Sequence, residues 1–342
     1  MKAVAELSKT QIEVPSVQST SRSKSHGLSE WLVEKALMMV TVVGSGIIFF
    51  VMAFIFSNAW PVFQASGLAF FTTSGWEQQF SNAWQATTTS QANYRFGALE
   101  LLMGTMYVSM GAMLLAGTLG LGCALFLAEI CPGWMRRPLE AAIHMLAAIP
   151  PIIYGLVGFL VVVPMIKSLI SDELALQMIK IASLDGTSLL AGMIVLGIMI
   201  TPTFVILATD ALRMVPRKYK EAALALGISP WRMMVKIMLP VARRGIITGA
   251  LLSSGMAVGE FVAMSLVAGG VVHLPSLAHG LVFFLEPVRP LASTIFINSE
   301  VIGMPALEAA LFACAALILT ISIIFNLLAQ LINGLGLSKG RS

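Results

Sequence analysis

The sequence predicts an all-α membrane protein with six transmembrane helices, and three observations support this fold class. Apolar residues make up 57% of the 342 residues and charged residues only 11%, with a mean hydropathy of +0.88. A soluble domain carries roughly 25% charged residues, so the chain falls outside the soluble range. Several apolar runs reach the ~20 residues that cross a bilayer as a helix. The period-2 alternation that a transmembrane barrel requires is weak.

The apolar runs divide the chain into a tail, a first span and a transmembrane core. Residues 1–30 are polar and rich in Ser and Thr, which predicts a disordered tail. This tail does not resemble a signal peptide, because its charged leader and the apolar run after it are both too long. A first helix and an external loop occupy 31–97, and the core occupies 98–334. The expected spans are 36–56, 98–128, 139–166, 187–209, 245–268 and 307–334.

The Lys and Arg residues predict the orientation in the membrane. Of the 21, only Arg95, Lys167, Lys180 and Arg289 flank the spans on one side. The other 17 lie in the tail, in the loop between spans two and three, in the loop 211–244 and at the C-terminus. Since cytoplasmic loops carry the excess of positive charge, both termini and 211–244 are predicted to be cytoplasmic. The external loop contains Trp60, Trp76 and Trp84, which we interpret as an interfacial aromatic belt, with a folded external cap as the alternative.

The loop 211–244 has the local signals of two short helices joined by a tight turn. Pro216 opens a polar helix that carries Glu221, Ala222 and Ala223. Gly227 suits the left-handed position that ends a helix. Ser229 can cap a second helix that has Pro230 at its first position. Small side chains at 222 and 223 would let another surface approach closely. An amphipathic loop on anionic lipid is the alternative, but lipid binding does not require Glu, Gly and Pro at these spacings.

The spacing in this loop resembles the ATPase-gripping loop of type I ABC importer permeases, and the rest of the core resembles the Pst-type phosphate permeases among them. The loop motif is Glu221-Ala222-Ala223-x-x-x-Gly227-x9-Ile237-x-Leu239-Pro240. Further similar elements are Phe96-Gly97, Gly104-Thr105, Gly120-Leu121-Gly122, Leu127-Ala128-Glu129-x-x-Pro132, Leu146-Ala147-Ala148-Ile149-Pro150, Tyr154-Gly155, Met199-Ile200-Thr201-Pro202 and Asp210-Ala211-Leu212-x-x-Val215-Pro216. Of the two Pst branches, the third and sixth spans are more similar to the PstC type.

This resemblance implies a fold, a function and a set of partners. The fold would be that of the MetI-like type I importer permeases. The chain would be a pore-forming subunit in the inner membrane, most simply for inorganic phosphate. Its partners would be a second permease subunit, two copies of an ABC ATPase and a periplasmic or lipid-anchored substrate-binding protein. It would not be an enzyme, because ATP would be hydrolysed on a separate chain.

One departure from the family pattern bears on the substrate. The family's fifth span usually carries Arg-Ala-x-Gly-Glu-Thr, whereas this chain has Met256-Ala257-Val258-Gly259-Glu260-Phe261. The acid is kept, and apolar residues replace Arg and Thr. Either the partner permease supplies the cation, or the solute is another oxyanion or a small polar molecule.

Glu260 is the leading candidate for the transport pathway, because an ionisable residue within an apolar span is costly unless it is paired, protonated or hydrated. A protonated Glu within a helix interface is the structural alternative. Prolines at 150, 151 and 202 predict kinks, which either line a pathway or are static bends. The candidates for the pathway are Glu260, Gly259, Pro150, Tyr154 and Thr201.

Several other functions lack their signatures. There is no G-x-x-x-x-G-K-[ST] segment, so no P-loop binds ATP on this chain. Cys123, Cys131 and Cys314 are far apart and form no C-x-x-C pair, which argues against a disulfide framework or a zinc site. Glu140 and His144 share a helix face but supply only two ligands, so we expect an interfacial polar pair and no metal or cofactor. The charge excess is small and one-sided, which does not favour nucleic acid. A passive channel has no use for an ATPase loop, and a membrane-embedded enzyme would need more than Glu260.

Overall fold

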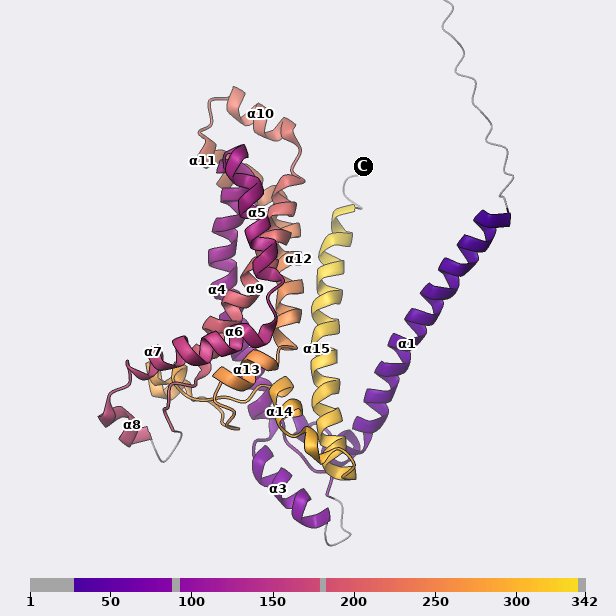
Figure 1. The fold of residues 1–342 in the computed structure, drawn as a ribbon, viewed down its shortest axis with the longest axis vertical. Helices are drawn as coiled ribbons and strands as arrows, with labels where there is room; N and C mark the ends of the chain where they lie inside the picture. The colour runs from indigo at the N-terminus through magenta and orange to yellow at the C-terminus, as the bar shows by residue number, and fades with distance from the viewer. Residues whose placement is uncertain (1–27, 88–92, 179–182, 338–342) are drawn as a thin grey trace, which may run out of the picture. The chain divides into compact units, whose positions relative to one another are not determined.

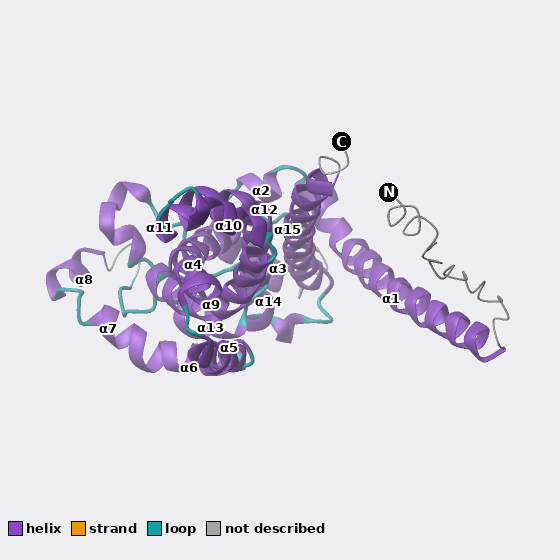
Figure 2. Ribbon diagram, turned by 90° about the horizontal axis from the view of Figure 1, so that it is seen from above, coloured by secondary structure: helices purple, strands orange, loops and turns teal. Residues whose placement is uncertain are grey.

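The computed structural model describes residues 28–87, 93–178 and 183–337, which form helices, turns and loops (Figures 1 and 2). No β-strand occurs in these ranges, and their one ladder contact is a single bridge between Gly269 and Val288. The predicted all-α fold class is therefore confirmed. The predicted tail lies almost entirely outside the described residues. In chain order the elements are α1 (Leu28–Ser66), α2 (Ala69–Thr72), α3 (Trp76–Thr87), α4 (Leu99–Leu125), η1 (Phe126–Ile130), α5 (Gly133–Ala147), α6 (Pro151–Val157), η2 (Gly158–Val162), α7 (Val163–Lys167), α8 (Asp172–Met178), α9 (Leu189–Arg213), α10 (Arg217–Ala225), α11 (Pro230–Met233), η3 (Met234–Met238), α12 (Leu239–Val258), α13 (Val262–Val267), η4 (Leu277–Phe284), α14 (Leu291–Ile297), η5 (Ser299–Val301) and α15 (Pro305–Leu337).

The chain divides into two compact units, 1–51 and 52–342. The described part of the first unit is the beginning of α1, whose apolar side chains from Trp31 onward are exposed. Apolar residues all round a helix are typical of a membrane span. The predicted first span, 36–56, falls within α1.

The second unit begins with a folded cap after α1. Trp76 at the start of α3 is fully buried, with its ring centroid 5.5 Å from that of Phe96 and 5.9 Å from that of Phe80. Trp60 and Trp84 are partly exposed. The belt interpretation is therefore wrong for Trp76, because its ring fills the core under the cap.

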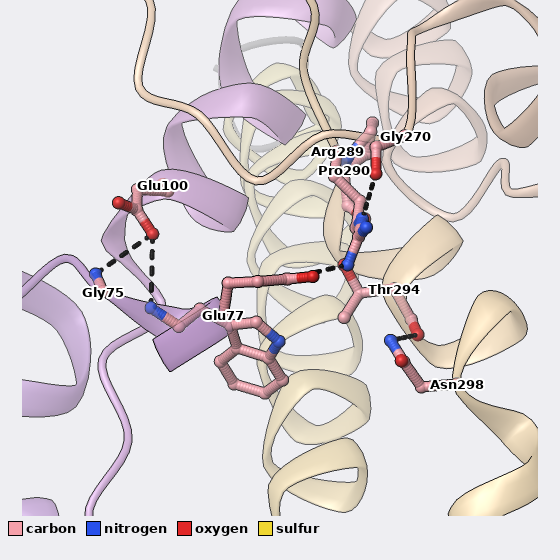
Figure 3. A network of polar contacts seen from close by, with 9 residues as sticks. Gly75, Glu77, Glu100, Gly270, Arg289, Pro290, Thr294 and Asn298 are labelled. Atoms are coloured by element: carbon pink, nitrogen blue, oxygen red, sulfur yellow. Dashed lines mark hydrogen bonds and ion pairs between the residues drawn. The ribbon is translucent and has the colours of Figure 1, made fainter. Parts of the chain in front are cut away.

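A polar network fixes this cap to the rest of the second unit (Figure 3). The Glu100 carboxylate at the start of α4 accepts hydrogen bonds from the backbone N–H groups of Gly75, at 3.2 Å, and Trp76, at 3.4 Å. The Arg289 guanidinium donates to Glu77 of α3, at 3.2 Å, and to the Gly270 carbonyl. One arginine thus joins α3 to both ends of the segment that leads from α13 to α14.

Helices α4, α9 and α12 pack side by side in the middle of the second unit (Figures 1 and 2). Small residues allow this approach: a Cβ at Gly245 would lie 2.6 Å from the Ala211 Cβ, and one at Gly249 would lie 2.9 Å from the Leu207 Cβ. Without a hydrophobic driving force in lipid, close packing of this kind drives helix association. α15 packs against α12.

The predicted third span is bent. α5 and the stretch from α6 to α7 meet at 88°, and the break falls at residues 148–150. Pro150 has an extended backbone and Pro151 is the first residue of α6, so neither can supply an N–H to continue α5. The kink expected from these prolines is confirmed. The Tyr154 hydroxyl donates to the Leu146 carbonyl at 2.8 Å, and this carbonyl also accepts from the Ile149 N–H at 3.2 Å, so the two bonds together tie α6 to the end of α5.

The predicted fifth span is broken as well. α12 ends at Val258, residues 259–261 leave the helix, and α13 continues to Val267. α13 packs against α6, where a Cβ at Gly155 would lie only 2.8 Å from the Ala263 Cα. The two interrupted spans therefore meet at their short inner helices.

Among the described helices, four are long and apolar enough to cross a membrane, within 31–66, 99–130, 189–213 and 305–332. The bent pair, α5 with α6–α7, makes a fifth if it is one span. α12 is not among these helices. It carries Arg243 and Arg244 near its start and ends at the break at 259–261. The count of six spans stays a prediction.

Candidate functional site

The predicted pair of short helices is present at one end of the second unit, where α10 and α11 lie beyond the ends of α4 and α5 (Figure 1). Pro216 is the N-cap of α10, and Gly227 has φ of +73°. The Ile228 N–H donates to the Ala223 carbonyl and the Gly227 N–H to the Leu224 carbonyl, each at 3.0 Å. This is the Schellman pattern, in which glycine takes the left-handed position that an L side chain avoids.

The second helix begins as the sequence predicts. The Ser229 hydroxyl accepts from the Arg232 N–H, and Pro230 is the first residue of α11. From Pro230 the chain is helical without interruption to Val258. The five-residue π-helical turn η3 lies directly before Leu239 and Pro240, where the missing N–H of proline disturbs the α-helical ladder. The last motif residues, Ile237, Leu239 and Pro240, therefore belong to the entry into α12.

The two alanines of the motif face different ways. Ala222 is exposed, whereas Ala223 is buried against Met233, Met234 and Met238. The close approach expected from small side chains occurs at Ala223 within the chain itself, because its size lets α10 pack closely on α11 and η3. Close approach of another chain at Ala222 stays a prediction.

The outward surface of the hairpin formed by α10 and α11 carries apolar side chains that sequence reasoning did not single out. Leu226 is 79% exposed and Trp231 64% exposed, and both flank the turn at Gly227. Glu221 is exposed nearby. Large exposed apolar side chains beside polar ones are typical of a protein interface. In the sequence, only the position of Leu226 and Trp231 on either side of the predicted turn could have pointed to them.

Two ion pairs join this hairpin and the end of α9 to the segment after α4. Lys220 of α10 pairs with Glu129 of η1, and Arg213 of α9 pairs with Glu140 of α5. Glu140 therefore bonds across to α9, rather than serving with His144 as an isolated pair. His144 lines a small cavity together with Glu140 and Thr209.

The pathway candidates fall into two groups. Glu260 lies in the break before α13, where its carboxylate accepts from the Ala263 N–H at 3.1 Å. Because Ala263 also faces Gly155, the residue after Tyr154, the structure brings the region of Glu260 together with α6. The expectation that Glu260 lies within a continuous helix is wrong, because α12 ends before it.

Two of the other candidates make contacts within or between neighbouring helices. Pro150 forms the bend between α5 and α6. The Thr201 hydroxyl donates to the Gly197 carbonyl one turn earlier in α9, at 2.6 Å.

Gly259 and Phe261 face an open groove of about 600 Å³ that continues onto α14 and α15. The side chains that line it are mainly apolar and include Ile295, Phe296 and Ile318. Met256, which stands where the family has Arg, is 57% exposed. This side of the break therefore offers no cation to an anionic solute in the described residues.

The segment between α13 and α14 contains a buried carboxylate that sequence reasoning also missed. Glu286 is fully buried and bonds to His273 Nε2 at 2.7 Å, His279 Nδ1 at 2.6 Å and the Ser276 N–H at 3.2 Å. The two ends of this segment are in contact with each other, because the Val288 N–H donates to the Ala268 carbonyl at 2.8 Å. A carboxylate with three hydrogen-bond partners is well satisfied, so Glu286 clamps the loop from inside.

Comparison with solved structures supports the fold. A bacterial alginate ABC transporter, crystallised with an alginate-bound periplasmic protein, aligns with a TM-score of 0.50 at 14% identity. The alignment covers 87% of this chain and 94% of the other. At this identity the likeness shows the fold alone.

Curated relatives share more sequence. The chain is 35% identical over 213 residues to the "Phosphate transport system permease protein PstC" of Pasteurella multocida (strain Pm70), covering 60% of this chain and 65% of the relative. It is 36% identical over 225 residues to the protein of that name in Xylella fastidiosa (strain 9a5c), covering 63% and 65%. It is 31% identical over 256 residues to "Phosphate transport system permease protein PstC 2" of Mycobacterium bovis (strain ATCC BAA-935 / AF2122/97), covering 69% and 76%. The chain thus spans slightly less than two thirds of the first two relatives.

The family comparison covers most of the helical core. Residues 116–334 match the family described as "Binding-protein-dependent transport system inner membrane component". The matched range runs from the middle of α4 to the end of α15, so it contains the hairpin, both interrupted spans and the clamped loop. The chain therefore belongs to the family of inner membrane components of binding-protein-dependent transport systems.

Proposed function

We propose that this chain is a pore-forming permease subunit of an ATP-driven ABC importer for inorganic phosphate. The hairpin α10–Gly227–α11 carries this proposal, because it presents a small, partly apolar surface at one end of the helical core. The substrate is inferred from the relatives, each of which is named as a phosphate transport system permease protein. ATP would be hydrolysed on a separate chain, consistent with the lack of a P-loop in this one.

The proposed assembly contains a second permease subunit, two copies of an ABC ATPase and a periplasmic or lipid-anchored binding protein. The positive-inside rule supports a position of the hairpin and both termini in the cytoplasm, where the ATPase would dock. ATP-driven closure of the two ATPases would draw the hairpins together and open the pore outward. Phosphate would then pass from the binding protein into the pathway.

Transport of another oxyanion is the second candidate. It is favoured by the exposed Met256 and by Phe261, which leave this region without the Arg and Thr of the family pattern. Uptake of labelled phosphate by the full complex, with sulfate as competitor, distinguishes the two. If sulfate at the same concentration as phosphate lowered phosphate uptake, transport of other oxyanions would be favoured.

Replacement of Gly227 by Val tests the docking proposal. A Cβ there meets nothing within 4 Å, so the substitution acts only through the +73° backbone angle. We expect Gly227→Val to abolish ATPase co-purification and phosphate uptake while the chain still inserts in the membrane, because the two short helices lose their fixed angle.

Gly303→Val is the matched control. Gly303 also has a left-handed φ, of +101°, and open space around it, but it lies before α15. We expect this variant to retain the ATPase. Wild-type co-purification and uptake in Gly227→Val would refute the docking assignment, as would equal loss of the ATPase in both variants.

A further inference from the structure

The hairpin formed by α10 and α11 has its own small apolar core. Ala223, Met233, Met234 and Met238 form a cluster separate from the clusters between the long helices. The hairpin is therefore held to the remaining helices mainly at its ends. On one side the chain continues through η3 into α12, and on the other Pro216 leads back to α9.

The ion pair between Lys220 and Glu129 adds a third attachment. The Glu129 side chain is only 11% exposed and that of Lys220 24% exposed. Glu129 lies in η1, the π-helical turn that continues α4, while Lys220 directly precedes the motif residue Glu221. The pair thus connects the docking helix to a long helix that is distant in the sequence.

Burial decides the strength of this connection. A fully exposed ion pair contributes little, because water and salt screen it. Removal of one partner from a pair that is shielded from water leaves an uncompensated charge, which is strongly unfavourable. The neighbouring pair between Arg213 and Glu140 is about one third exposed on each side, so the Glu129–Lys220 pair is the firmer contact.

We infer that Glu129 is a positioning residue for energy coupling, and that it passes movement of α10 to α4 through Lys220. This inference rests on the proposed docking of an ATPase at α10. Movement of the hairpin would act on α12 through the continuous helix and on α4 through the ion pair. Since α4 and α9 pack along their length, the two connections move both sides of the central helix group together.

Charge reversal tests this role in the complete transporter reconstituted in liposomes, with phosphate uptake and ATP hydrolysis measured together. We expect Glu129→Lys and Lys220→Glu each to lower uptake per ATP hydrolysed about tenfold, a change within the usual range of coupling between sites. The ATPase should still co-purify, because Glu221, Gly227 and the exposed apolar residues are intact. The double reversal should restore coupling.

A variant with two neutral side chains distinguishes a loss of coupling from a loss of folding. Glu129→Gln with Lys220→Met leaves no unpaired charge, so the protein should assemble with wild-type thermal stability but couple poorly. Wild-type coupling in this variant would overturn the inference, and so would reversed single variants that transport normally. Loss of ATPase binding in the Glu129 variants would also overturn it, because Glu129 would then act in docking. Failure of the wild-type chain to bind an ATPase would instead refute the proposed function.

Discussion

At the scale of single residues, Glu260 shows how a costly group is accommodated. An ionised carboxylate in an unbroken apolar helix has no free partner, because every backbone N–H is already bonded. In the structure the helix stops at Val258, and the first N–H groups of α13 are free to donate to the Glu260 side chain. The break therefore supplies the hydrogen bond that a continuous span would lack.

The charge on Glu260 can be tested apart from its shape. Glu260→Gln keeps an oxygen that accepts from the Ala263 N–H, so we expect normal assembly, and we expect uptake to stop if the charge is needed at the gate. Glu260→Leu removes the acceptor and should also lower stability by about 1–3 kcal/mol.

Uptake in liposomes and thermal unfolding in detergent measure the two effects of the Glu260 substitutions. Glu173→Gln, at an exposed position on α8, is the control for loss of a carboxylate. Normal uptake by Glu260→Gln together with an unstable Glu260→Leu would show that the residue is structural.

At the scale of elements, the sequence predicted the features that depend on neighbouring residues. The hairpin of α10 and α11 followed from Pro216, Gly227 and Ser229, since caps and turns depend on neighbours in sequence. The bend at Pro150 and Pro151 followed from the missing N–H groups, whereas its angle of 88° and the packing of α6 on α13 have no local signal. The sequence signals did not mark the break after Val258, because the stretch stays apolar on both sides.

Burial that depends on distant partners was also beyond the sequence signals. The Trp76 ring is enclosed by Phe96 and the start of α4, which the pattern of the external loop does not specify. Glu286 is satisfied by side chains 7 and 13 residues away in an irregular segment, where no helical or strand period relates them. The sequence also did not show which of Ala222 and Ala223 is buried, since the buried side of α10 is fixed by its packing on α11 and η3.

The bend between α5 and α6 has a testable hydrogen bond. Tyr154→Phe keeps the ring and removes the donor to the Leu146 carbonyl, so we expect a loss of about 1 kcal/mol in stability and a lower melting temperature. Tyr107→Phe is the control, because the Tyr107 ring packs against Phe283 and the described residues show no bond to its hydroxyl. Equal melting temperatures for the two variants would show that the Tyr154 hydroxyl does not hold the bend.

At the scale of the whole molecule, orientation follows from charge and is open to a direct test. Cysteines placed at Gln64 and Lys218, in a background without Cys123, Cys131 and Cys314, both occupy exposed positions in the second unit. Reactivity with an impermeant thiol reagent then reports the side of the membrane, because burial does not differ. We expect intact cells to label position 64 and not position 218. The reverse pattern would invert the topology.

The loop between α13 and α14 closes on itself through Ala268 and Val288, is clamped inside by Glu286 and is held at its end by Arg289. The loop is also part of the core, because Phe283 and Val288 pack among the long helices and the Leu189 N–H donates to the Glu286 backbone carbonyl at 2.9 Å. Glu286 thus bonds to the loop through its side chain and to the start of α9 through its backbone. A change in the conformation of this one residue would therefore disturb the loop and the beginning of α9 together.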